Sequence, residues 1–98
     1  MKKTFKLTHN KLHPDRLVDA IKHEVKKYIK RERNRKLPDG TDYWDFDCRF
    51  GADEGICDVI HMSEINKSID GAVEDKLESF YLEILARAAT RNKNTDQD

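Results

Sequence analysis

The stretch YWDFDCRF, residues 43 to 50, constrains the fold most strongly, because apolar and charged side chains alternate without exception from Trp44 to Phe50. Successive side chains of a strand point to opposite faces of its sheet. A period of two is therefore typical of a strand with one buried face and one wet face. Trp44, Phe46, Cys48 and Phe50 are the predicted inner residues.

Three further strands and two helices are predicted from the same kind of periodicity. Strands are expected in TFKLT, residues 4–8, in ICDVIHMS, residues 56–63, and in SFYLEILA, residues 79–86. A helix begins at Pro14, whose fixed φ and missing N–H suit a first helical position. Ser63 can cap a second helix, whose apolar stripe consists of Ile65, Ile69, Ala72 and Val73.

The register of the hairpin between the second and third predicted strands has two solutions. If Phe50 pairs with Ile56, the inner set includes Ile60 and Met62. A shift of one residue swaps the faces of the strand, and the inner set becomes Cys57, Val59 and His61. We favour the first solution.

The order of the predicted elements is β-α-β-β-α-β, which indicates an α+β fold of the ferredoxin-like type. In that sandwich two helices cover one face of a four-stranded antiparallel sheet, and the other face stays open. Right-handed crossovers then favour the strand order 4-1-3-2. The length suits a single domain over residues 1–89, and the polar tail, residues 90–98, is predicted to be disordered.

A net charge of zero conceals a strong asymmetry along the chain. Residues 1–36 contain 13 Lys and Arg against 4 Asp and Glu, a net of +9, whereas residues 37–98 contain 6 against 15, a net of −9. Such asymmetry indicates a partner for the basic half, or pairing of opposite charges within the molecule or between copies. It therefore also predicts weak self-association as a homodimer.

The first candidate site is the basic face of the helix that begins at Pro14. Its apolar stripe runs from Leu17 to Ile29, so packing is expected to end near Ile29 while the helix overhangs the core to about Lys36. Cations spaced about 5–6 Å apart can each neutralise a phosphate of RNA or DNA. A solvated helix end would explain the same charges. The candidate residues are Lys22, Lys26, Lys27, Lys30, Arg31, Arg33, Arg35 and Lys36.

An alternative site is predicted on the open sheet face, formed by Asp45, Asp47, His61 and Glu83. Carboxylates at i and i+2 beside a histidine could bind a divalent cation or act as an acid and a base. Cross-strand charge pairs explain the pattern equally well. Protein interaction through this open face, or through the charge asymmetry, is a further alternative. Base stacking on the sheet is disfavoured, because the outward positions lack an aromatic platform.

Other functional classes lack a sequence signal. The chain contains no dinucleotide, phosphate-loop or esterase motif, so neither a cofactor nor a catalytic residue is predicted, and no metal site is assigned beyond that alternative. No apolar run approaches the ~20 residues that span a bilayer, and no apolar segment follows the basic start. The protein is therefore predicted to be cytoplasmic. Cys48 and Cys57 lack CxxC spacing and are expected to be buried thiols.

Three stretches carry a resemblance to a known family: KLPDGTDYWDFDCRFG, VIHMSEINKSID and LESFYLEILARA. With them the chain resembles, from Met1 to about Thr90, a family of small uncharacterised bacterial proteins of unknown function. The resemblance implies a bacterial cytosolic source and no activity, substrate or catalytic residue. The residues themselves favour a non-enzymatic nucleic-acid-binding accessory protein that uses the basic helix face.

Overall fold

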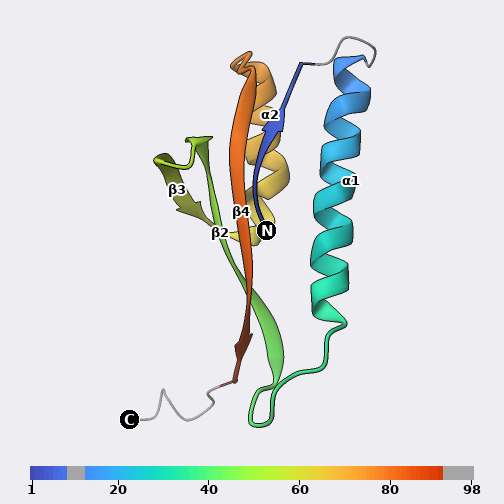
Figure 1. Ribbon diagram of the computed structural model, residues 1–98, viewed down its shortest axis with the longest axis vertical. Coiled ribbons are helices and arrows are strands. Elements are labelled where there is room, and N and C mark those ends of the chain that lie inside the picture. The colour runs from blue at the N-terminus through green and yellow to red at the C-terminus, as the bar shows by residue number, and fades with distance from the viewer. Residues whose placement is uncertain (9–12, 92–98) are drawn as a thin grey trace.

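The computed structural model describes residues 1–8 and 13–91, arranged as Figure 1 shows. The predicted α+β class is confirmed, because two helices accompany a four-stranded sheet in which every pairing is antiparallel. A short 3-10 helix, η1, is the one addition to the predicted order of elements along the described chain. The elements are β1 (Lys2–Lys6), α1 (Pro14–Arg33), β2 (Tyr43–Asp53), β3 (Ile56–Ile60), η1 (Met62–Glu64), α2 (Ile65–Glu74) and β4 (Ser79–Ala89).

The strand order is β1-β4-β2-β3, so the ferredoxin-like order 4-1-3-2 is not confirmed. Both orders allow right-handed crossovers with the two helices on one face, so handedness alone does not choose between them. Strand length and burial distinguish them. The two 11-residue strands, β2 and β4, pair from Tyr43↔Ala89 to Gly51↔Tyr81. β4 buries four residues, whereas β1 buries only Phe5, so a central β4 removes more apolar surface from water.

The core lies between one sheet face and both helices. The register places Phe5 opposite Phe80 and Cys48 opposite Ile84, so these side chains share a face. Stacked rings strengthen the centre, because the centroid of Phe80 lies 5.4 Å from that of Phe5. The helices contribute buried residues to the same cluster, namely Ile21 and Val25 from α1 and Ile65, Ile69 and Ala72 from α2. Both helices therefore cover the same face of the sheet.

The β2–β3 hairpin has the favoured parity but a different register. Cys48 faces Ile60, which places Ile60 on the inner face as predicted. Phe50 faces Asp58 and not Ile56, a displacement of two residues. The displacement arises because β2 continues to Asp53 before the chain turns, which leaves a much tighter connection than the predicted five-residue loop.

A β-bulge between Gly51 and Asp53 creates this longer hairpin. Asp53 Oδ1 accepts hydrogen bonds from the N–H groups of Gly55 at 2.8 Å and Ile56 at 2.9 Å, which closes the turn. At the bulge the two strands approach closely, because a Cβ on Gly51 would lie 2.0 Å from the carbonyl oxygen of Ile56. Only glycine fits this position without a backbone shift.

The third predicted strand is shorter than expected, because a capped turn ends it after Ile60. Ser63 does not cap α2 as predicted, because the N-cap residue of α2 is Glu64, which makes no side-chain cap hydrogen bond. His61 instead caps η1, and its Nδ1 accepts a hydrogen bond from the Ser63 N–H at 3.1 Å. The His61 N–H in turn donates to Glu64 Oε1 at 2.9 Å, which completes a capping box. Met62 therefore lies in η1 instead of in a strand.

Two further predictions concern the ends of elements and the membrane. Helix α1 ends at Arg33, before the predicted Lys36, and the Asn34 N–H closes it on the carbonyl oxygen of Arg31 at 3.2 Å.

Within residues 1–8 and 13–91, no helix has both the length and the apolar character needed to cross a membrane. Most of the tail predicted to be disordered, residues 92–98, lies outside the described residues.

Candidate nucleic-acid interface on helix α1

Helix α1 is fixed at its start by local sequence and presents its cations near its end. His13 is the N-cap, and its Nδ1 accepts a hydrogen bond from the Asp15 N–H at 3.3 Å. The last turn contains Lys30, Arg31 and Arg33, which compensate the negative end of the helix dipole. Dipole compensation thus explains some of the positive charge, and the contacts of each cation decide how much remains for a ligand.

Lys22, the first residue of the predicted basic face, is held by the other helix. Its Nζ donates a hydrogen bond to Asp70 Oδ1 of α2 at 2.6 Å. This ion pair joins the two helices above the core, and a ligand could use Lys22 only by breaking it. Lys22 is therefore a structural cation in this fold.

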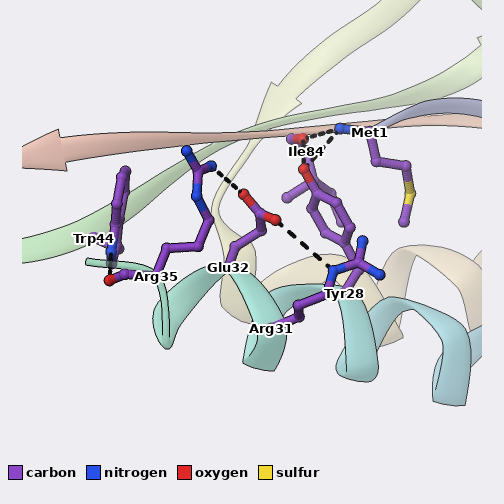
Figure 2. A network of polar contacts seen from close by, with 7 residues as sticks. All are labelled: Met1, Tyr28, Arg31, Glu32, Arg35, Trp44 and Ile84. Carbon is purple, nitrogen blue, oxygen red and sulfur yellow. Dashed lines mark hydrogen bonds and ion pairs between the residues drawn. The ribbon is translucent and has the colours of Figure 1, made fainter. Parts of the chain in front are cut away.

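The end of α1 carries a network around Glu32, shown in Figure 2. The Glu32 carboxylate accepts a hydrogen bond from Arg35 Nη1 at 2.7 Å and lies 3.9 Å from Arg31 Nε. Because the Glu32 side chain is only 13% exposed, these cations compensate a carboxylate that water reaches poorly. Arg35 also lies 5.1 Å from the ring centroid of Trp44, whose Nε1–H donates to the Arg35 carbonyl oxygen at 3.0 Å. The helix end therefore packs on β2, which corrects the predicted overhang.

A second group of contacts in Figure 2 anchors the inner side of α1 to β4. The Met1 amino group donates hydrogen bonds to the carbonyl oxygen of Ile84 at 2.6 Å and to the Tyr28 hydroxyl at 3.0 Å. Burial is the main cause that lowers the pKa of the Met1 amino group and raises the pKa of Tyr28. These contacts anchor α1 to β4 and so fix which side of the helix faces away from the sheet.

Three lysines of α1 make no contact with a carboxylate among the described residues. Lys26, Lys27 and Lys30 are exposed and make no ion pair within residues 1–8 and 13–91. At a rise of about 1.5 Å per residue, Lys26 and Lys30 lie about 6 Å apart along the helix axis. Lys27 lines a hollow on the opposite flank of α1, where the carboxylate of Glu24 also lies. Lys36, beyond the helix, is exposed as well.

A groove between α1 and η1 brings cations and apolar side chains together. Its rim contains Lys26, Lys30 and Arg33, which follow each other at spacings of four and three residues on one side of α1. Ile29 and Met62 line the same groove, and both are partly buried against the core. Arg33 Nη2 lies 3.8 Å from Met62 Sδ, so the guanidinium spans the two walls.

The residues of the alternative site on the open sheet face interact with other side chains and not with one another. Asp45 and Asp47 lie on this face as predicted, but Arg87 bridges both carboxylates, with Nη2 2.8 Å from Asp45 Oδ2 and Nε 3.0 Å from Asp47 Oδ2. The hydrogen bond to Asp47 is the main cause that raises the pKa of Arg87. These carboxylates therefore form the cross-strand charge pairs that the sequence also allowed.

Glu83 belongs to a separate part of the open face. Its register partners are Lys2 on β1 and Arg49 on β2. Glu83 Oε1 also accepts a hydrogen bond from the Tyr81 hydroxyl at 2.8 Å. Burial, and then this hydrogen bond, raise the pKa of Tyr81 to about 12. Glu83 is thus engaged away from the aspartates that Arg87 holds.

His61 approaches the aspartates but does not complete a metal site. It lines a cleft at the end of β3 together with Asp45, Asp47 and Glu64. Its Nδ1 is occupied by the cap of η1, 2.8 Å from Ser63 Oγ and 3.1 Å from the Ser63 nitrogen. Among the residues that the structure describes, no group of three or more His, Cys, Asp or Glu side chains is arranged to hold a metal ion.

Sequence periodicity identified the lysines of the groove but missed Met62. The chain pattern placed Met62 on the inner face of a strand, whereas the capping box at His61 carries it into η1, beside Arg33. A histidine cap followed three residues later by Glu64 was the one local signal for this turn.

Comparison with known proteins identifies the family. The model of a family of unknown function, DUF6172, matches residues 1–95, and the chain therefore belongs to that family. The resemblance to a small uncharacterised family is thereby confirmed. Neither the curated proteins nor the solved structures contain a match to this chain.

Proposed function

We propose that this protein is a non-enzymatic accessory protein that binds RNA through the basic face of α1. The observation that carries the proposal is the state of Lys26, Lys27 and Lys30, which are exposed and make no ion pair with the described residues. A cation without a carboxylate partner binds a phosphate without first losing an ion pair. A cytoplasmic bacterial location, as predicted from the sequence, would place the protein among RNA.

The contacts also set the expected strength of the salt dependence. Lys22, Arg31 and Arg35 are paired with carboxylates, and Lys36 lies beyond the end of α1, so these four are left out of the count. Three free lysines and Arg33, which has no carboxylate partner among the described residues, leave four cations. Each duplex phosphate contact contributes about −0.9 to the slope of log K against log salt, so four contacts predict a slope near −3.6.

A salt titration of RNA binding tests the proposal. Fluorescence anisotropy with a labelled RNA duplex should give the slope near −3.6 for the wild type. Replacing Lys26, Lys27 and Lys30 with Gln should bring the slope to about −0.9, because three of four contacts are lost. The matched control carries the same three-charge loss at exposed lysines away from this face, Lys6, Lys67 and Lys76. Equal losses in both triple variants, or no binding by the wild type at low salt, would refute the proposal.

A second candidate function is protein interaction, and β3 favours it. β3 is an edge strand, and its Ile56 and Val59 side chains are 68% and 73% exposed. Apolar side chains on an open strand edge are typical of surfaces that add another strand. Val59 shares the open face with Arg49, so a weak homodimer could form there. Sedimentation velocity at low salt should show a dimer that Val59→Lys abolishes, and a monomer at every concentration would exclude it.

A further inference from the structure

We infer that the groove between α1 and η1 binds single-stranded nucleic acid, with an unstacked base against Ile29 and Met62 and phosphates on Lys26, Lys30 and Arg33. The inference rests on the proposed RNA-binding function and names the ligand class that the same face would take. It follows from features of the groove that phosphate binding alone does not use.

The apolar wall of the groove favours the binding of single strands over duplexes. Ile29 and Met62 are partly buried, and they line the same concave surface as the cations of α1. A duplex keeps its bases stacked and offers this wall only sugar and phosphate. A single strand can splay a base out of the stack and place its planar face on an apolar wall, while neighbouring phosphates reach the lysines. The thioether of Met62 is polarisable and makes favourable contacts with aromatic rings.

Arg33 is positioned to serve both parts of such a ligand. Its guanidinium carbon lies 5.7 Å from the ring centroid of Phe46, and its Nη2 lies 3.8 Å from Met62 Sδ. These contacts orient the planar group without neutralising it. An oriented guanidinium can donate two parallel hydrogen bonds to a phosphate or stack on a base. Arg33 thus joins the cationic rim to the apolar wall.

An acidic peptide is the competing ligand for a basic groove. A peptide helix that docks in a groove needs apolar anchors at i, i+3, i+4 and i+7, and hence an extended apolar floor. Two side chains, Ile29 and Met62, provide a single apolar patch here. One planar group covers such a patch, and a row of anchors does not. The geometry therefore favours a nucleotide over a peptide.

Four probes of the wild-type protein test the inference: oligouridine, an abasic ribose-phosphate oligomer of equal charge, an RNA duplex and oligoglutamate. Anisotropy at about 50 mM salt should show oligouridine binding about five-fold or more tightly than the abasic oligomer, and also more tightly than the duplex. Equal affinity for the three nucleic-acid probes would overturn the inference and leave the proposed function standing. Binding of none of them would refute both. Oligoglutamate binding as tight as oligouridine binding would assign the groove to peptides and overturn the inference.

The two methionines of the chain, Met1 and Met62, locate the base. With ¹³C-methyl methionine labelling, oligouridine should shift the Met62 methyl signal and leave that of Met1 in place, because Met1 lines the other flank of α1. Met62→Ser should reduce the preference for oligouridine over the abasic oligomer about five-fold, and Met62→Leu should retain most of it. An unshifted Met62 signal at saturating oligouridine would overturn the inference without any variant.

Discussion

Replacing Gly51 with alanine should damage the β2–β3 hairpin more than its small size suggests. The added Cβ would lie 2.0 Å from the carbonyl oxygen of Ile56, 2.4 Å from Cys57 Cα and 2.8 Å from Cys57 Cβ. All three separations are far shorter than the ~3.5–4.0 Å at which non-bonded carbon atoms pack. The obstructing atoms are mostly backbone, so no side-chain rotation relieves the overlap. The strands must move apart by more than about 1 Å at the bulge.

The expected loss of stability combines two costs. Overpacking in an ordered region costs about 1–3 kcal/mol, and each hairpin hydrogen bond broken by the movement costs about 1 kcal/mol more. We therefore expect Gly51→Ala to lower the free energy of unfolding by about 3 kcal/mol, a large part of the ~5–15 kcal/mol typical of a domain of this size. Urea unfolding followed by Trp44 fluorescence measures the loss.

Gly71 is the matched control for this substitution. It lies inside α2, and a Cβ there would meet nothing within 4 Å. Gly71→Ala should raise the free energy of unfolding by about 0.5–1 kcal/mol, because alanine loses less backbone entropy in a helix. If Gly51→Ala were as stable as the wild type while Gly71→Ala behaved as expected, the close approach at the bulge would be wrong.

Three further predictions follow from the burial of single side chains. Since the pKa of Tyr81 is raised to about 12, against ~10 when unfolded, its stabilising effect is complete below pH ~10 and is lost between pH ~10 and ~12. The urea midpoint of the wild type should therefore fall between pH ~10 and ~12, and the midpoint of Tyr81→Phe should fall less over the same range. Equal falls in the two proteins would contradict this assignment. Cys48 is buried as expected, whereas Cys57 is only partly buried, so the prediction of a buried thiol was wrong for Cys57. Because burial raises the pKa of Cys48 to about 11, a thiol reagent at pH ~8 should modify only Cys57 until the protein unfolds, and two fast thiols in the native protein would contradict this. Phe80→Ala should cost ~3–5 kcal/mol in a urea titration, since Phe80 is 0% exposed, and a cost below ~1 kcal/mol would show that its site collapses.

The faces of the strands could be predicted because they depend on local alternation. Phe46 and Cys48 are buried on the inner face, as the period of two indicated, and Trp44 is partly buried on the same side. The strand order could not be predicted in this way. It depends on where β4 pairs, and both candidate orders satisfy the handedness of the crossovers.

The candidate site shows the same division between local and long-range information. Helical periodicity identified Lys26 and Lys30 on the outer side of α1, where they lie. It could not show that Lys22 is paired with Asp70 of α2, because this contact joins distant parts of the chain. Met62 lines the groove because the turn capped by His61 places it in η1. Its position beside α1 also depends on the strand order, which puts β3 at the sheet edge.

The central place of β4 has a consequence for folding during translation. β4 is the last of the described elements along the chain, yet it pairs with both β1 and β2, and it brings Lys2 opposite Glu83. Until β4 leaves the ribosome, only the β2–β3 hairpin and the helices can form. The apolar faces of the two helices then have no complete sheet to cover them. Pairings over such sequence distances are slow, so the sheet should be completed only after β4 has left the ribosome.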